Sequence, residues 1–184
     1  MFKWSTYYQN TLPVGFMLRE EYGARWLRVH SLPNSKRYPE GKEDEIEVCK
    51  RSLESAKDVL GASNITVYFS IYDESKDAAI SGSEWLKSLD FKSIEYKDVS
   101  EDDEDPYYLI TFGAKFDWDE ELFQQIILDV AKENISYISF YSKETKGVFS
   151  PYDGGADLFY LEPSKREQAQ VKFKKWISPR EDGL

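Results

Sequence analysis

The spacing of the apolar residues follows two patterns that alternate along the chain. In some segments every second residue is apolar, which is typical of strands, and in others the period is about 3.6 residues, which is typical of helices. The clearest strand is NITVYFSIY (64–72), where Ile65, Val67, Phe69 and Ile71 share one face. RWLRVH (25–30) is short and half-polar, which indicates a sheet edge, whereas YYLITF (107–112) is apolar on both faces and indicates an internal strand. Four further strands are predicted at 91–99, 135–141, 147–152 and 156–161.

Helical periodicity marks the segments 43–60, 81–89, 117–134 and 164–177. In the first of these the apolar stripe is Ile46, Cys49, Leu53, Ala56 and Leu60, so we expect Cys49 to be an inert core residue. The resulting order, β-α-β-α-β-β-α-β-β-β-α, predicts a single α+β domain over residues 1–177. We expect a mixed β-sheet with helices packed mainly on one face, a C-terminal hairpin followed by a surface helix, and a frayed tail over 178–184.

The charge of the chain limits its partners. There are 34 acidic and 24 basic side chains, giving a formal net charge of −10. This charge disfavours general nucleic-acid binding, which depends on neutralising phosphates, and it disfavours an anionic membrane surface. It permits a basic protein partner. No apolar run is long enough for a membrane span, and MFKWSTYYQN has no signal-peptide core, so we expect a cytoplasmic protein.

Common catalytic and cofactor motifs are absent from the sequence. It has no G-x-G-x-x-G, P-loop or G-x-S-x-G stretch. One histidine and one cysteine are too few for a usual structural zinc site, so we expect no metal and no cofactor. These features favour a non-enzymatic protein, and nothing in the sequence indicates an oligomeric state.

EDDEDP (101–106) places five carboxylates in a row, which predicts an exposed loop with fast hydrogen exchange. Together with Asp117, Asp119, Glu120 and Glu121 it could form an acidic binding face, or it could simply be solvated surface.

HSLPNSKRYPE (30–40) contains the only histidine and lies in a cluster of cations. Arg25, Arg28, Lys36 and Arg37 all fall within the thirteen residues from 25 to 37. On a strand, Trp26, Arg28 and His30 share one face. The loop could bind an anion through its arginines, or the arginines could form ion pairs that fix an irregular loop.

PYDGGAD (151–157) predicts the hairpin turn. Gly154 and Gly155 are expected at positive φ, and Asp153 can cap the turn with its own side chain. Asp153 and Asp157 could instead bind a hard cation or the arginines of the earlier stretch.

RWLRVHSLPNSKRYPE (25–40) and YDGGADLFYL (152–161) resemble an uncharacterised, mainly bacterial family, the domain-of-unknown-function 3885 family. The family implies no activity, cofactor or partner. The resemblance implies that the two stretches form one signature and lie close in space. Its members here are His30, Ser31, Leu32, Pro33, Ser35, Lys36, Arg37 and Tyr38 with Tyr152, Asp153, Gly154, Gly155 and Asp157.

Two functions therefore stand as hypotheses. The first is a small acidic interaction protein, by analogy of charge and size an immunity-type inhibitor of a basic partner. The alternative is an enzyme or a binder of small anionic ligands, with His30 as general acid or base and Arg28 and Arg37 holding the anion. The candidate ligand- or partner-binding residues are Arg28, His30, Ser31, Lys36, Arg37, Tyr38, Tyr152, Asp153, Gly154, Gly155 and Asp157.

Overall fold

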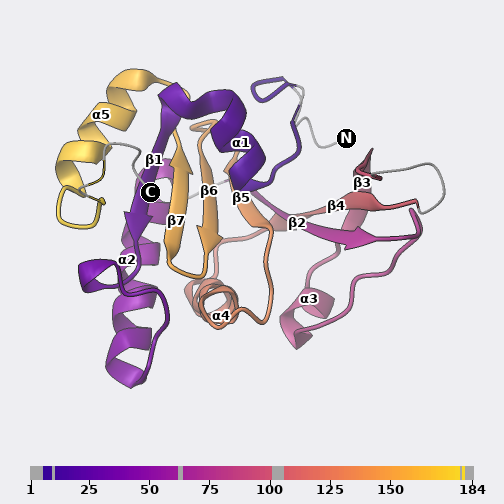
Figure 1. Ribbon diagram of the computed structural model, residues 1–184, viewed down its shortest axis with the longest axis horizontal. Coiled ribbons are helices and arrows are strands. Elements are labelled where there is room, and N and C mark those ends of the chain that lie inside the picture. The colour runs from indigo at the N-terminus through magenta and orange to yellow at the C-terminus, as the bar shows by residue number, and fades with distance from the viewer. Residues whose placement is uncertain (1–5, 10, 62–63, 101–105, 179, 181–184) are drawn as a thin grey trace.

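A computed structural model describes residues 6–9, 11–61, 64–100, 106–178 and 180 of the chain. Within these residues, seven strands form one sheet in the order β1-β7-β6-β5-β2-β4-β3 (Figure 1). The strands are β1 (Trp26–His30), β2 (Ile65–Asp73), β3 (Lys92–Asp98), β4 (Tyr108–Phe116), β5 (Ile138–Ser142), β6 (Val148–Tyr152) and β7 (Gly155–Phe159). The predicted edge position of β1, the internal position of β4 and the C-terminal hairpin are confirmed.

Every pair of neighbouring strands is antiparallel, so the α+β class is confirmed but the predicted mixed sheet is wrong. The reason lies in the connections. The helix after β4 leads to β5, which runs in the same direction as β4, but β2 lies between them and runs the opposite way. Strands with the same direction are thus always separated by an antiparallel one.

The described residues form five α-helices and two short 3₁₀ turns. These are α1 (Gly15–Tyr22), η1 (Gly23–Arg25), η2 (Pro33–Ser35), α2 (Lys42–Leu60), α3 (Glu84–Ser88), α4 (Glu120–Ala131) and α5 (Pro163–Lys172). The order agrees with the sequence prediction except for α1, which the apolar pattern does not indicate because Leu18 is its one buried residue. Of the tail 178–184, only Ser178 and Arg180 are described, so its fraying stays a prediction.

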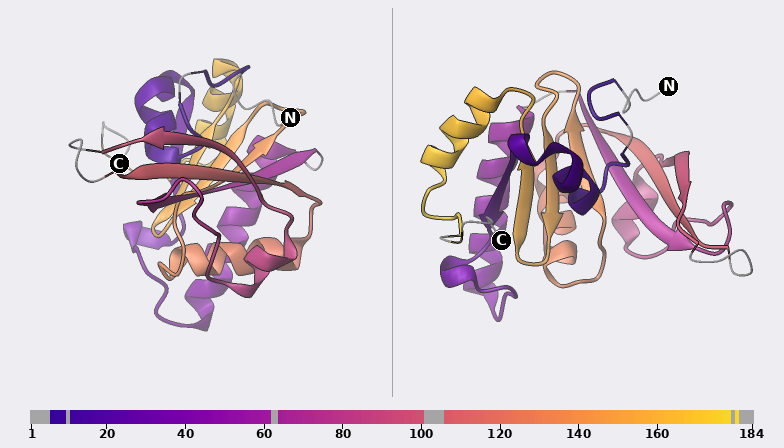
Figure 2. Two further views of the ribbon diagram at one scale, coloured as in Figure 1. Left: turned by 90° about the vertical axis from the view of Figure 1, so that its right-hand side faces the viewer. Right: turned by 45° about the horizontal axis from the view of Figure 1, so that its top comes forward.

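The helices cover the two faces of the sheet unequally (Figures 1 and 2). α2 and α4 pack on one face, α1 crosses the other, and α5 lies beside the β1 edge. The alternation of side chains along β6 explains this layering, since Phe149 faces the main core while Val148 packs with Leu18 in the cluster near α1. The main core therefore lies between the sheet and the α2–α4 layer.

The buried face of α2 agrees with the predicted stripe at Ala56 and Leu60 but differs from it nearer the start of the helix. Val48, Ser52 and Val59 are buried, whereas Ile46 is 62% exposed and Cys49 is only half-buried. The rotation is possible because small serines can face the sheet; Ser55 satisfies its hydroxyl by donating to the Arg51 carbonyl at 2.7 Å. Cys49 is consequently a wall of the groove between α2 and α4 rather than a core residue.

The β6–β7 turn needs glycine for a reason other than the predicted one. Gly154 and Gly155 do not have positive φ. Instead, a Cβ on Gly155 would lie 2.0 Å from the carbonyl oxygen of Val29 on β1, far inside contact distance. The glycine therefore permits β1 and β7 to approach closely where His30 pairs with Gly155.

Gly155→Ala should lower the free energy of unfolding by roughly 3 kcal/mol or more, because the added methyl group forces apart two paired backbones. Chemical denaturation of this variant and of Gly23→Ala measures the effect. Gly23 has open space around the same added carbon, so its variant should unfold like the parent. Equal stability of the two variants would contradict the close approach.

Candidate functional site

The register of the β1–β7 ladder places Arg28 directly opposite Asp157. Arg28 binds the carboxylate bidentately, with Nε donating to Oδ1 at 2.8 Å and Nη2 donating to Oδ2 at 2.9 Å. Trp26, two residues earlier on the same strand face, donates its indole N–H to Oδ1 at 2.8 Å. The side chains of Arg28 and Asp157 are only 14% and 5% exposed, so this is a shielded, bidentate ion pair.

Aromatic rings surround the Arg28 guanidinium. Its carbon lies 4.4 Å from the centroid of Tyr152 and 5.6 Å from that of Trp26. Burial alone would lower the pKa of Arg28, but the hydrogen bonds and charge of Asp157 raise this pKa above its ordinary value. Burial raises the pKa of Tyr152 to about 12, so its hydroxyl is protonated at neutral pH.

A second, more exposed ion pair joins the two signature stretches above the first. Arg37 donates to Asp153, whose other oxygen accepts the Gly154 N–H at 3.0 Å. The Ser31 N–H donates to the Gly154 carbonyl at 2.9 Å. The expected contact between the HSLPNSKRY and DGGAD stretches is therefore present, and it consists of the Arg37–Asp153 pair and the Ser31–Gly154 hydrogen bond.

Two of the candidate residues lie elsewhere. Lys36 binds Glu40 and Asp44 at 2.9 and 2.7 Å, which ties the loop to the first turn of α2. The His30 side chain lines a separate cavity with Arg51. The cluster thus contains Arg28, Ser31, Arg37, Tyr38, Tyr152, Asp153, Gly154, Gly155 and Asp157.

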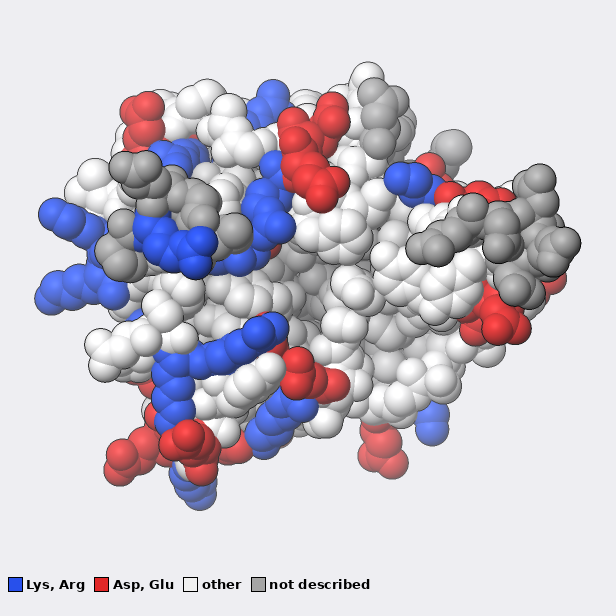
Figure 3. Space-filling view, viewed as in Figure 1, with Lys and Arg blue, Asp and Glu red and all other residues white. Residues whose placement is uncertain are grey.

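A cavity of about 520 Å³ opens beside this cluster. Arg28, Asp157 and Ser150 line it from the sheet, and Arg37 and Asp153 line it from the loop and turn. The start of α1 and the connection between α4 and β5 also contribute Phe16, Glu133 and Tyr137. Figure 3, which views the face crossed by α1, shows acidic and basic side chains close to one another on this face.

Sequence reasoning missed several of these groups. Trp26 could have been found, because it alternates with Arg28 on one strand face. Phe16, Glu133, Tyr137 and Ser150 carry no local signal, since they come from separate elements. Tyr38 connects the HSLPNSKRY loop to the segment that follows α4, because its hydroxyl donates to Glu133 at 3.3 Å.

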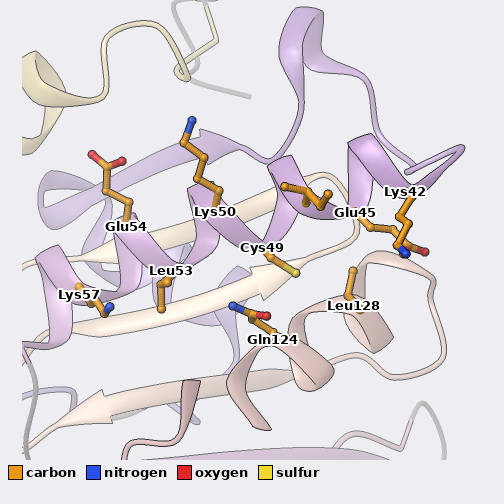
Figure 4. A pocket seen from close by; sticks show the side chains of 10 residues that line it. Lys42, Glu45, Cys49, Lys50, Leu53, Glu54, Lys57, Gln124 and Leu128 are labelled. Carbon is orange, nitrogen blue, oxygen red and sulfur yellow. The ribbon is translucent and has the colours of Figure 1, made fainter. Parts of the chain in front are cut away.

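The groove between α2 and α4 is a second cavity, of about 620 Å³, with Cys49, Leu53 and Leu128 on its walls (Figure 4). Burial, followed by the charge of Glu45, raises the pKa of Cys49, so its thiol is protonated and a poor nucleophile. Within the described residues no group of three or more histidine, cysteine or carboxylate side chains is placed to hold a metal ion.

Of the carboxylates expected to form one acidic face, the structure describes only those that follow β4. Asp117 to Glu121 follow its last residue, while 101–105 precede its first and lie outside the described residues. Asp119 is also occupied as the N-cap of α4, accepting from Glu121 and Leu122, and Glu120 pairs with Lys57 at 3.0 Å.

Comparison with known proteins identifies the family. A family model described as a domain of unknown function (DUF3885) matches residues 14–181. The chain belongs to this family. The DUF3885 match covers both signature stretches and the elements between them. Neither the search of curated proteins nor that of solved structures gives a match. Among the helices of the described region, none has the length and apolar character needed to cross a bilayer.

Arg28→Met should destabilise this DUF3885 chain by roughly 3 kcal/mol, because it leaves the Asp157 carboxylate shielded without its cation. Adding Asp157→Asn should restore part of the loss, since the amide oxygen can still accept from Trp26 and no charge remains. Urea denaturation of the single and double variants measures both effects.

Arg37→Met is the control for this prediction. The Arg37 side chain is 62% exposed, although its partner Asp153 is only 10% exposed, so this variant should lose clearly less stability than Arg28→Met. If Arg28→Met and Arg37→Met have the same stability, or if the double variant is less stable than Arg28→Met, the shielded pair is not the structural centre of the cluster.

Proposed function

We propose that this chain is a non-enzymatic, cytoplasmic interaction protein and that the cavity beside the Arg28–Asp157 pair receives a basic side chain of a protein partner. The observation that carries the proposal is the charge of the cavity. Its lining contains three carboxylates, Glu133, Asp153 and Asp157, but two arginines, and each arginine is already bound to one of the carboxylates. The unmatched charge is therefore negative, and it belongs to Glu133.

Glu133 is available to a partner. It is exposed, and the one hydrogen bond of its carboxylate among the described residues is the long one from Tyr38. It lies in the connection that follows α4, where its φ of 58° turns the chain toward β5. An incoming ammonium or guanidinium would gain a carboxylate partner there without breaking either arginine pair.

Exposed aromatic rings around the cavity support the same conclusion. Phe16, Tyr38 and Tyr137 are exposed, and Phe16 and Tyr137 meet edge to face with centroids 6.2 Å apart. Tyrosine and arginine are enriched in the residues that dominate the affinity of protein interfaces, and aromatic faces attract cations. The net charge of −10 would also steer a basic partner to the surface. An immunity-type inhibitor of a basic toxin would use these features.

The alternative function, binding of a small anion by the arginines, has a specific feature in its favour. The exposed Arg37 keeps its terminal nitrogens free of bonds to described residues. The enzyme version of this alternative is less well supported, because His30 does not line the cavity and the hydroxyl of Tyr152 stays protonated. The excess of carboxylates makes a cation the better ligand.

Amide NMR spectra during titration with a short capped peptide containing one arginine should show shifts at Phe16, Glu133 and Tyr137. Glu133→Gln should weaken the binding about threefold, the effect of one partly exposed charge pair. Glu74→Gln removes an exposed carboxylate outside the cavity and should leave the affinity unchanged.

A capped peptide containing one glutamate distinguishes the two hypotheses. It should cause no shifts at the cavity. If the glutamate peptide shifts Arg37 and its neighbours while the arginine peptide does not, the ligand is an anion and the proposal is wrong. The absence of chemical-shift changes with both peptides would also contradict a charge-selective cavity.

A further inference from the structure

His30 belongs to a different cavity, of about 370 Å³, at the outer edge of β1. Its backbone N–H donates to the Trp176 carbonyl at 2.7 Å, and its carbonyl accepts from Nη1 of Arg51 at 3.2 Å. The imidazole is thus held between the sheet edge, α2 and the segment that follows α5. Residues of the η2 turn, Asn34 and Ser35, form another wall.

The ionisable side chains that line this cavity are all basic. They are His30, Arg51 and Lys175, and no carboxylate belongs to the described lining. In a chain with an excess of acidic residues, three basic groups around one cavity are a marked local exception. Glu47 does pair with Arg51, but it does so at Nε, 2.6 Å away.

The donors in this cavity are incompletely used. His30 Nε2 is buried and makes no hydrogen bond to any described residue. Nη2 of Arg51 likewise has no acceptor within the described part of the chain, and Lys175 has no ion pair there. Buried polar atoms normally have hydrogen-bond partners, so an unpartnered one beside two cations indicates a ligand that supplies acceptor oxygens.

We propose that His30, Arg51 and Lys175 form a binding site for a tetrahedral oxyanion, such as the phosphate group of a small molecule. The three residues come from β1, α2 and the segment after α5, and they line one cavity. Arg51 is fixed in place by Glu47 and by the Trp176 ring, 5.3 Å from its guanidinium carbon. The cavity is larger than a phosphate ion, which leaves room for the organic part of the ligand.

The site is distinct from the cavity proposed for a basic partner. The two lie on either side of the HSLPNSKRY loop, with Arg37 and Asp153 lining one and Asn34 and Ser35 lining the other. Their charges are opposite, so each should reject the ligand of the other. Failure of either proposal leaves the other intact.

The occupancy of the site can be followed through the pKa of His30, because the only histidine of the chain gives one unambiguous imidazole signal in NMR spectra. Burial, followed by the charges of Arg28 and Arg51, lowers the pKa of His30 below its ordinary value. A bound dianion stabilises the imidazolium, so the pKa should rise in sodium sulfate relative to sodium chloride at equal ionic strength. Sulfate is the probe because its charge is constant over the pH range in which histidine titrates.

Lys175→Gln should weaken sulfate binding about threefold, whereas Lys174→Gln, a change at the neighbouring exposed lysine, should leave it unchanged. Sodium acetate at the same ionic strength should raise the pKa of His30 less, because one carboxylate cannot engage all three donors. Equal pKa values in sulfate and chloride would overturn the site. A larger rise with acetate than with sulfate would overturn its assignment to a tetrahedral oxyanion.

Discussion

The shielded ion pair between Arg28 and Asp157 is the interaction on which the rest of the structure depends. Removing two charges from water is costly, and the cost is offset only where geometry is good and the remaining donors and acceptors are satisfied. Here the pair is bidentate, the Trp26 indole donates a further hydrogen bond to the carboxylate, and the Tyr152 ring covers the guanidinium. A slip of one residue in the β1–β7 register would put Arg28 or Asp157 on the wrong face, so the pair also specifies the register.

Both proposed sites follow from this anchored edge strand. Because β1 is fixed against β7, the loop that leaves it must pass over the hairpin turn, where Arg37 meets Asp153 and Ser31 meets Gly154. The same strand ends with His30, which the backbone of Trp176 covers from the other side. One stretch of sequence therefore borders two cavities of opposite charge, which explains why the cations of an acidic chain gather around its single histidine.

The sequence predicted the order of the elements well because periodicity is local. The alternation in 64–72 and the helical stripe in 117–134 each contain enough apolar residues to identify β2 and α4. Strand direction was predicted wrongly, because a local period contains no information about which strands become neighbours. α1 was missed because a single buried leucine gives no measurable period.

The candidate site was predictable only where its chemistry is concentrated in sequence. Cations in an acidic chain will find carboxylates, and the signature stretches indicated Asp153 and Asp157. The partner of Trp26 depends on the register, and the rim residues Phe16, Glu133 and Tyr137 meet only in the folded chain. The sequence also did not show why residue 155 is a glycine, because the carbonyl oxygen that leaves no room for a side chain belongs to Val29, more than a hundred residues away.

Hydrogen exchange at the arginine side chains tests the central pair most directly. In a ¹⁵N-resolved NMR spectrum, the Nε–H of Arg28 should exchange slowly with water above neutral pH, because it is bound to Asp157 and shielded. The Nε–H of Arg37, whose side chain is 62% exposed, should exchange faster and serves as the internal reference. Equal exchange rates for the two would show that the Arg28–Asp157 pair is open to solvent and would contradict its role as the anchor of the β1 edge.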